Sequence, residues 1–173
     1  MVCHDLMRDC KINVVDAKIE NYSKYGSTFL AKRFDRDKNK RIHFSSAMNL
    51  LGKHDNDADV GYLDIVSFIR SSGSHPNKDL LELYKRLAFN MLVRNTDGHL
   101  RNHGFLMNKH GWRLSPAYDV NPTPYGDQLS LCVTENSRLI NYQSAVKVAG
   151  YYGIEKNQAI DIFKTQRNII MEN

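Results

Sequence analysis

The stretch Asn95-Thr96-Asp97-Gly98-His99-Leu100-Arg101-Asn102 decides how the rest of the chain is interpreted. Asp97 and Asn102 stand five residues apart in it, and a second carboxylate, Asp119, follows farther along the chain. Two short extended runs around a glycine-containing turn predict a β-hairpin over residues 104–116, which would bring Asp119 back beside the first two side chains. Phosphoryl transfer needs magnesium held on the phosphates by oxygen ligands and a carboxylate near the attacking hydroxyl. The stretch therefore predicts a site for a metal-bound triphosphate.

Spacing alone leaves a simpler interpretation of these residues open. An aspartate followed five residues later by an asparagine is a common pattern with no function of its own. Asp97-Gly98 could form an ordinary turn, Asn102 could lie at a strand edge, and Asp119 could cap a helix. The catalytic interpretation is favoured by the context, because a long apolar helix is predicted before the stretch and a hairpin after it.

Two histidines and an arginine in the same region also have competing interpretations. His99 and His103 are four residues apart, a spacing that can bind zinc when both side chains lie on one helix face. Gly98 and Gly104 flank the pair and argue against a helix, so His99 is better interpreted as a polar support for the loop or a phosphate contact. Arg101 either faces a phosphate or lies at the surface as an ordinary arginine.

The most regular helical pattern in the sequence immediately precedes this stretch. Asn77 is the predicted N-cap, and Asp79 falls in the first turn, where the helix dipole favours an anion. Apolar residues at helical spacing form one wide face: Leu80, Leu81, Leu83, Tyr84, Leu87, Ala88, Phe89, Met91, Leu92 and Val93. A face this wide predicts the central helix of the domain, which delivers the chain directly into Asn95.

The rest of the chain predicts short strands and helices around that central helix. The predicted elements are a helix over 1–10, a short β segment over 12–15, a strand over 28–35 paired with the segment before it, a helix from Ser45 or Ser46 to Gly52, a helix over 61–70, a short strand over 129–133, and helices over 142–152 and 155–170 separated by Gly153. Residues 35–41 predict a solvated loop. Residues 54–59 also predict a loop, because they lack the central glycine and the final glutamate of a calcium-binding loop.

Composition fits one ordinary domain. The 173 residues are 42% apolar, which is enough for a single core. The net charge of +5 makes phosphate-bearing partners plausible, although no block of basic residues stands out. The three cysteines, Cys3, Cys10 and Cys132, lack a paired metal spacing and indicate a reducing compartment. No stretch has the length of a signal peptide core or a membrane span, so the sequence predicts a cytoplasmic protein.

Two groups of residues resemble one known family. The stretch 95–102, followed by Leu114-Ser115-Pro116-Ala117-Tyr118-Asp119-Val120, resembles the catalytic loop and metal-binding motif of the HipA family of bacterial toxin kinases. Phe29-Leu30-Ala31-Lys32-Arg33-Phe34-Asp35-Arg36 is similar to the family's strand and hinge that receive the adenine. With the helices between them, the resemblance covers nearly all of the chain.

The resemblance implies a mainly α, α+β fold: the C-terminal lobe of a protein kinase, helical, with short β-hairpins near the hinge and the catalytic loop. The chain would be a single domain over 1–173, with strands and hinge in 1–36 and the helical lobe in 37–173. Its ligands would be ATP and Mg²⁺, and its activity that of a serine/threonine protein kinase.

The resemblance also implies a role for each candidate site residue. Asp97 would be the catalytic acceptor, and Asn102 and Asp119 would bind the metal. The nucleotide-binding residues would be Lys32, Arg33 and Phe34 at the adenine, His99, Leu100, Arg101 and Asn102 along the phosphates, and Tyr118 and Asp119 at the metal.

Family members are toxins of toxin–antitoxin pairs, which implies an aminoacyl-tRNA synthetase as substrate and a helix-turn-helix antitoxin as partner. DNA would be reached only through the antitoxin. The chain departs from the family pattern because it begins after the N-terminal lobe, which carries the phosphate-covering loop and the ATP-positioning lysine. We therefore expect a separately encoded N-lobe and an exposed apolar face where it would bind. The alternative is a non-catalytic binding module, a pseudokinase or remnant, that contacts an antitoxin or another partner.

Overall fold

A computed structural model describes residues 2–55, 57 and 59–173 of the chain. Met1, where the first helix was predicted to begin, and Asn56 and Ala58, in the run predicted as a loop, lie outside the described residues. In chain order the elements are α1 Val2–Asp9, β1 Ala17–Ser23, β2 Gly26–Ala31, β3 Arg36–Asp37, β4 Lys40–Arg41, β5 Phe44–Ser46, α2 Ala47–Leu50, α3 Tyr62–Ser72, α4 Pro76–Leu92, η1 Leu100–Asn102, β6 Gly104–Asn108, β7 Gly111–Leu114, α5 Tyr142–Val148, η2 Ala149–Tyr152 and α6 Lys156–Glu172. The predicted α+β class is confirmed.

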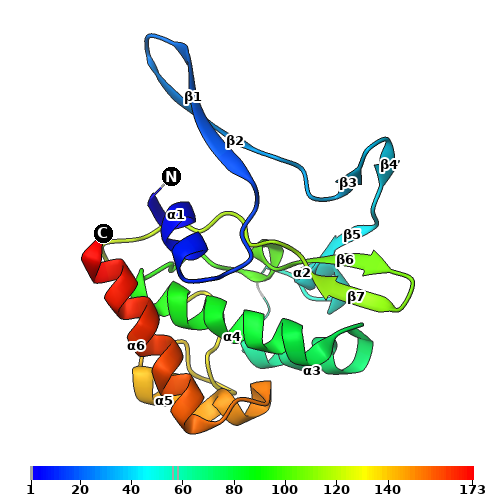
Figure 1. The fold of residues 1–173 in the computed structure, drawn as a ribbon. Coiled ribbons are helices and arrows are strands. Elements are labelled where there is room, and N and C mark those ends of the chain that lie inside the picture. The colour runs from blue at the N-terminus through cyan, green and yellow to red at the C-terminus, as the bar shows by residue number, and fades with distance from the viewer. Residues whose placement is uncertain (1, 56, 58) are drawn as a thin grey trace.

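Helix α4 lies at the centre of the fold, between α3 and α6 (Figure 1). Leu83, Tyr84 and Leu87 on its apolar face are fully buried, as the helical spacing predicted. The predicted cap at Asn77 is wrong, because Pro76 occupies the first helical position and His75 the capping position. Proline suits that position because its fixed φ is helical and its missing N–H would have no partner there.

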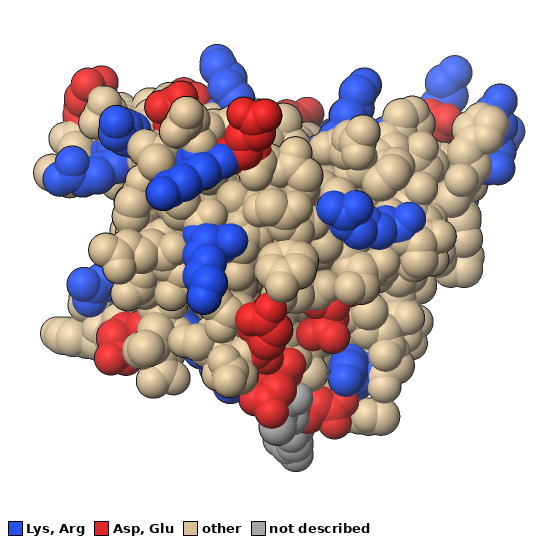
Figure 2. Space-filling model, turned by 90° about the horizontal axis from the view of Figure 1, so that it is seen from below, with Lys and Arg blue, Asp and Glu red and all other residues tan. Residues whose placement is uncertain are grey.

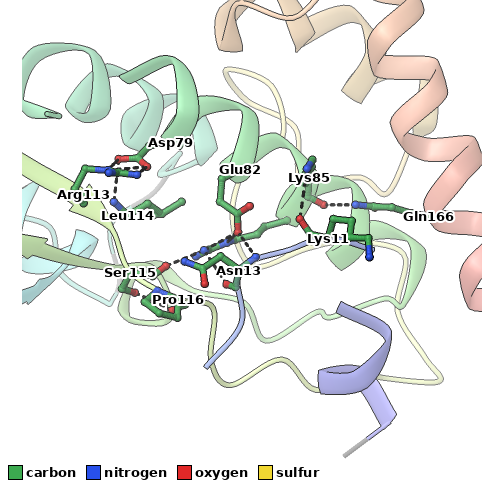
Figure 3. A network of polar contacts seen from close by, with 11 residues as sticks. Lys11, Asn13, Asp79, Glu82, Lys85, Arg113, Leu114, Ser115, Pro116 and Gln166 are labelled. Atoms are coloured by element: carbon green, nitrogen blue, oxygen red, sulfur yellow. Dashed lines mark hydrogen bonds and ion pairs between the residues drawn. The ribbon is translucent and has the colours of Figure 1, made fainter. Parts of the chain in front are cut away.

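A three-stranded antiparallel sheet of order β5-β6-β7 covers one end of α3 and α4. The predicted hairpin is confirmed: β6 and β7 pair from Phe105↔Leu114 to Asn108↔Gly111, with Gly111 at φ 131° in the turn. Asp79 of α4 holds β7, since its buried carboxylate accepts bonds from the Arg113 guanidinium, at 2.9 Å, and from the Leu114 amide, at 3.1 Å (Figure 3). The hairpin thus returns the chain to the region of the catalytic loop.

The β1–β2 hairpin stands away from the helical body (Figure 1). It is a separate two-stranded antiparallel sheet in which Ala17 pairs with Ala31 and Ile19 with Phe29. The side chains of Ile19 and Phe29 are 44% and 50% exposed. An apolar cross-strand pair is therefore only half covered by the residues that the structure describes.

Two sequence predictions about loops and strands need correction. The polar run over residues 35–41 is not only a loop, because β3 and β4 form a two-rung ladder around Lys38, whose φ is 53°. Residues 129–133 do not form a strand: they are buried, but their amides bond to unrelated carbonyls, with Leu129 N–H donating to Arg138 and Cys132 N–H to Val60. Burial of an apolar run does not by itself create a continuous ladder.

The core has a main cluster around α3, α4 and α6 and a smaller one beneath α1. In the smaller cluster, Leu6 and Met7 of α1 contact Phe89 of α4 and Ala117. All three cysteines are buried and unbridged. Among the described helices, none is both long enough and apolar enough to cross a membrane.

Candidate active site

The loop that carries Asp97 is anchored to the helical core by two asparagines. Asn95, 2% exposed, donates from its backbone N–H to the Asn90 carbonyl at 2.8 Å and from Nδ2 to Asn90 Oδ1 at 3.2 Å. Asn90 in turn donates to the Tyr62 hydroxyl of α3 at 2.9 Å. Because buried amide groups must be paired, this chain of bonds fixes where the loop leaves α4.

A second set of bonds holds the loop just before Asp97. The Thr96 carbonyl accepts from Ser130 Oγ at 2.6 Å, and Thr96 Oγ1 donates to Thr123 Oγ1 at 3.1 Å. Asp97 itself is exposed, and its carboxylate has no hydrogen-bond partner among the described residues. A rigid backbone thus presents a free carboxylate, which is the state that a proton acceptor needs.

The structure brings Asn102 and Asp119 into direct contact. Asn102 Nδ2 donates to Asp119 Oδ2 at 3.0 Å and to the Asp119 carbonyl at 3.1 Å. Asn121 Nδ2 donates to the other carboxylate oxygen, Oδ1, at 3.0 Å. Asp119 has φ 56°, in the left-handed region that non-glycine residues seldom occupy.

Tyr118 joins the catalytic loop to the predicted hinge. Its hydroxyl donates to the Arg101 carbonyl at 2.6 Å, and its ring stacks on Phe34 with centroids 5.6 Å apart. Burial, partly offset by Arg86 and reinforced by neighbouring Asp119, raises the pKa of Tyr118 to about 12. The hydroxyl therefore stays protonated and remains a donor at neutral pH.

The other two predicted hinge residues bond to neighbours of their own. Lys32 uses its backbone N–H within the chain, donating to the Asp16 carbonyl at 2.7 Å. The exposed Arg33 guanidinium donates to both carboxylate oxygens of Asp35, at 2.8 and 2.6 Å. The bonds from Arg33 lower the pKa of Asp35 to about 2. Of the predicted adenine-binding residues, Phe34 packs its ring against Tyr118, the residue before Asp119.

The residues predicted to contact phosphates differ in exposure: Leu100 is buried, His99 is half-buried and Arg101 is exposed. Leu100 is 3% exposed and packs in the main core, so its backbone alone could face a ligand. The Arg101 side chain forms an ion pair with Asp55. His99 is half-buried, and its Nδ1 is buried without a partner in the part of the chain that the structure describes.

His103 is a buried neutral histidine beneath the loop. It is 3% exposed and packs edge-on against the Tyr62 ring at 5.3 Å. Burial, together with the nearby Arg86 and His99, lowers the pKa of His103 to about 3. Within the described residues, no group of three or more His, Cys, Asp or Glu side chains is placed to hold an ion, so His99 and His103 belong to no such group.

Asn102 and Asp119 nevertheless fit a magnesium ion that also binds a ligand's phosphates. Magnesium prefers oxygen ligands and usually keeps several waters, being held by one or two carboxylates together with substrate phosphates. Asp119 supplies a carboxylate at the surface, and the amide oxygen of Asn102 has no partner among the described residues. Two protein groups of this kind match such a site.

A buried arginine network beneath the site was not predicted from the sequence. Arg86 of α4, 2% exposed, donates from Nη2 to the Ser115 carbonyl at 2.7 Å and to the Asn13 carbonyl at 3.2 Å. Its Nε and Nη2 also donate to Glu82 Oε1, at 2.9 and 2.8 Å, and Glu82 Oε1 accepts from the Asn13 amide at 3.0 Å. Figure 3 shows Asn13, Glu82 and Ser115 converging on this network. A charged residue beside Leu87, on the apolar face of α4, was the available sequence signal.

A cavity of about 520 Å³ lies between α1, the β1–β2 hairpin and the segment after Tyr118. Val15, Ile19 and Phe29 give it an apolar wall, while Asp119 and Asn121 line it with polar groups. Its volume is that of an ordinary ligand pocket. The cavity can take an aromatic ring against the apolar wall and present a carboxylate to charged groups of the same ligand.

The same fold occurs in two solved kinase-related structures. The chain aligns over 99% of its length with HipA of Shewanella oneidensis MR-1, solved with HipB and operator DNA, at a TM-score of 0.82, 19% identity and 47% coverage of that chain. It also aligns over 99% of its length with the proinflammatory kinase CtkA of Helicobacter pylori, at a TM-score of 0.63, 16% identity and 80% coverage of that chain. At these identities the likeness shows the fold.

The sequences of curated relatives also indicate a similarity to kinases. A candidate kinase of Haemophilus influenzae is 34% identical over 108 residues, which are 56% of this chain and 32% of that protein. A candidate kinase of Sinorhizobium fredii is 29% identical over 118 residues, which are 62% of this chain and 28% of that protein. The chain thus spans about a third of the length of the relatives it matches. The model of the HipA-like C-terminal domain matches residues 1–172, and the chain belongs to that family.

Proposed function

We propose that this chain is the catalytic-loop and metal-binding half of a HipA-like serine/threonine protein kinase that transfers the γ-phosphoryl group of ATP to a protein hydroxyl. The observation that carries the proposal is the Asn102–Asp119 pair: Asp119 is bonded to Asn102 at 3.0 Å and lines the 520 Å³ cavity. Family membership supports the same reaction class.

In this proposal each site residue has a defined task. Asn102 and Asp119 hold Mg²⁺, which neutralises charge on the phosphates when it is bound. Asp97 orients the acceptor hydroxyl and takes its proton, as the hydroxyl oxygen bonds to the γ-phosphorus and the bond to the bridging oxygen of ADP breaks. Phe34 and Tyr118 keep the hinge against the catalytic loop, the adenine lies along the hinge residues Lys32, Arg33 and Phe34, and the apolar wall at Ile19 and Phe29 packs against it.

We further propose that another lobe covers the nucleotide from above. The half-exposed Ile19 and Phe29 of the β1–β2 hairpin support this part of the proposal, because an apolar pair of this kind is normally covered in a finished cleft. The lobe would supply the phosphate-covering loop and the lysine expected in this family.

The partners follow by analogy with the structural neighbour. Because the Shewanella HipA was solved with HipB and operator DNA, we propose a DNA-binding antitoxin as a partner and contact with DNA only through it. The protein substrate would be of the aminoacyl-tRNA synthetase class expected for the family, and the protein would work in the cytoplasm.

Calorimetric titration of the purified chain with ATP and Mg²⁺ tests the nucleotide site. We expect binding that requires Mg²⁺, that is lost in Asp119→Ala and that is kept in the matched control Asp127→Ala, which removes another exposed carboxylate. Binding that is independent of Mg²⁺, or equal in the two variants, would contradict the assignment of Asp119.

Transfer is tested separately by adding an upper-lobe candidate and following phosphate incorporation into protein. Asp97→Asn should abolish the restored transfer while leaving the Mg²⁺-dependent binding of ATP unchanged. Nucleotide binding without any transfer would instead favour the second candidate function, a non-catalytic module that contacts an antitoxin or other partner.

A further inference from the structure

Two neighbouring apolar grooves run along the side of α6, away from the nucleotide cavity. They measure about 680 and 450 Å³ and meet at Tyr142, which is 44% exposed and lines both. The apolar lining of the first comes from Val146, Ala149, Ile154 and Ile160, and that of the second from Met91, Leu92, Ile140 and Phe163. Tyr142 packs edge-on against Phe163 with ring centroids 5.0 Å apart, and its side chain separates the two grooves.

Cations border both grooves in a regular order. Three cations lie on one face of α6: Lys156, Lys164 and Arg167. Ile160 stands between the two lysines, so the four positions follow one another at spacings of four, four and three residues. Lys147 of α5 stands beside the first groove. None of these cations forms an ion pair with a residue that the structure describes.

Acidic residues lie near this stripe without pairing with it. Asp161 precedes Lys164 by three residues and Glu155 is the N-cap before Lys156, but neither forms an ion pair with a residue that the structure describes. Figure 2 shows the underside of the molecule as a mainly uncharged surface with separate Lys and Arg side chains, and with Asp and Glu side chains both along its upper edge and toward its lower edge. The grooves thus combine apolar depth with a border of Lys156, Lys164 and Arg167, which form no ion pair with a described residue, while Lys147 lies near Glu135.

We propose that this face is a docking site for an acidic amphipathic helix of a partner protein. A helix of that kind would place two apolar anchors in the grooves on either side of Tyr142 and its carboxylates against Lys156, Lys164 and Arg167. From Lys156 to Arg167 the stripe is roughly 17 Å long, about three turns of a partner helix. This inference does not depend on phosphoryl transfer, because no residue of the proposed active site lines either groove.

A protein helix fits these grooves better than nucleic acid does. Surfaces that bind DNA are polar and strongly positive, and their cations contact phosphates across an open face. Here the cations border hollows lined by Leu92, Ile160 and Phe163, which would stay uncovered beneath a phosphate backbone. Apolar anchors are therefore part of the recognition.

Selection from a phage-displayed library of helical peptides against the wild-type chain tests the proposal. The enriched peptides would be synthesised, and their affinity measured by fluorescence anisotropy for the wild type and for the double variant K156E/K164E. The matched control, K40E/K109E, reverses two exposed lysines in other parts of the molecule. Tyr142→Ala removes the divider between the grooves without changing any charge.

We expect the enriched peptides to carry acidic residues around two apolar anchors. Their affinity should fall at least about tenfold in K156E/K164E and in Y142A, and stay unchanged in the control. Three results would overturn the proposal: no enrichment, enriched peptides that are neutral or basic, or equal binding to K156E/K164E and the control. A duplex DNA that binds the wild type, is lost in K156E/K164E and is indifferent to Y142A would assign the face to nucleic acid instead.

Discussion

The floor and the roof of the candidate nucleotide cavity are built in opposite ways. Beneath it, Arg86, Asn90 and His103 are almost fully buried and tie α4 to the catalytic loop and to the segment that leads to Asp119. Above it, Ile19 and Phe29 of the β1–β2 hairpin are about half exposed, and the hairpin pairs with no other described strand. The floor is packed by its own contacts, whereas the roof leaves an apolar pair half exposed.

This difference predicts that substitutions in the floor and in the roof affect different properties. Substitutions in the floor should change the free energy of unfolding, because buried charges and polar groups lose their partners. Substitutions in the roof should leave that free energy nearly unchanged and act on ligand or partner binding. The following variants test the division, in order of decreasing expected effect on stability.

Arg86→Met should give the largest loss. It leaves Glu82 and the carbonyls of Asn13 and Ser115 without their buried donor, and removing one partner of a buried ion pair costs about 3–5 kcal/mol. The free energy of unfolding would be measured by urea denaturation. The control is Arg70→Met, whose exposed guanidinium donates to the Tyr151 carbonyl, and we expect a loss of about 0.5 kcal/mol or less there. Equal losses in the two variants would show that the network does not stabilise the floor.

The Arg86 network also shows what the sequence could not predict. Helical spacing predicted α4 and its buried face, and the apolar runs around Gly111 predicted the β6–β7 hairpin, because both patterns are local. Arg86 joins Asn13 to Ser115, two positions about a hundred residues apart, and no local pattern reports such a bond. The site shows the same limit, since the contact of Asn102 with Asp119 followed from the hairpin, but the one between Asn121 and Asp119 was not foreseen.

The buried His103 should make stability depend on pH. Its pKa is about 3 in the folded protein against 6.5 as the ordinary value, so between these values the unfolded chain binds more protons. The contribution of neutral His103 to the free energy of unfolding is therefore fully present above pH 6.5. It decreases as the pH falls, by about 2 kcal/mol from pH 7 to pH 5. Urea denaturation at both pH values should show a smaller difference in His103→Gln. The control His110→Gln, at the exposed β6–β7 turn, should keep the wild-type difference, and a His103→Gln variant that kept it too would exclude His103 as its source.

Tyr118→Phe tests the link between floor and hinge. It removes the hydrogen bond to the Arg101 carbonyl but keeps the ring that stacks on Phe34, so we expect a loss of about 1 kcal/mol. Thermal unfolding measures the loss, with Tyr125→Phe, an exposed tyrosine, as the unaffected control. No loss would mean that the Arg101 carbonyl is equally well satisfied by water.

Phe29→Ser should have the smallest effect on stability and the most specific effect on binding. Because Phe29 is 50% exposed, its removal should change the free energy of unfolding by only about 0.5 kcal/mol, although removal of a fully buried phenylalanine costs about 3–5 kcal/mol. The same side chain lines the cavity wall, so the affinity for ATP with Mg²⁺ should fall several-fold in the calorimetric titration.

The control is Phe68→Ser, on the face of α3 that packs against the main core. A large loss of stability is expected there because Phe68 contacts Phe105 and Trp112. If Phe29→Ser instead destabilised the chain as much as Phe68→Ser, the roof would already be a packed part of the fold, and no covering lobe would be needed to complete it.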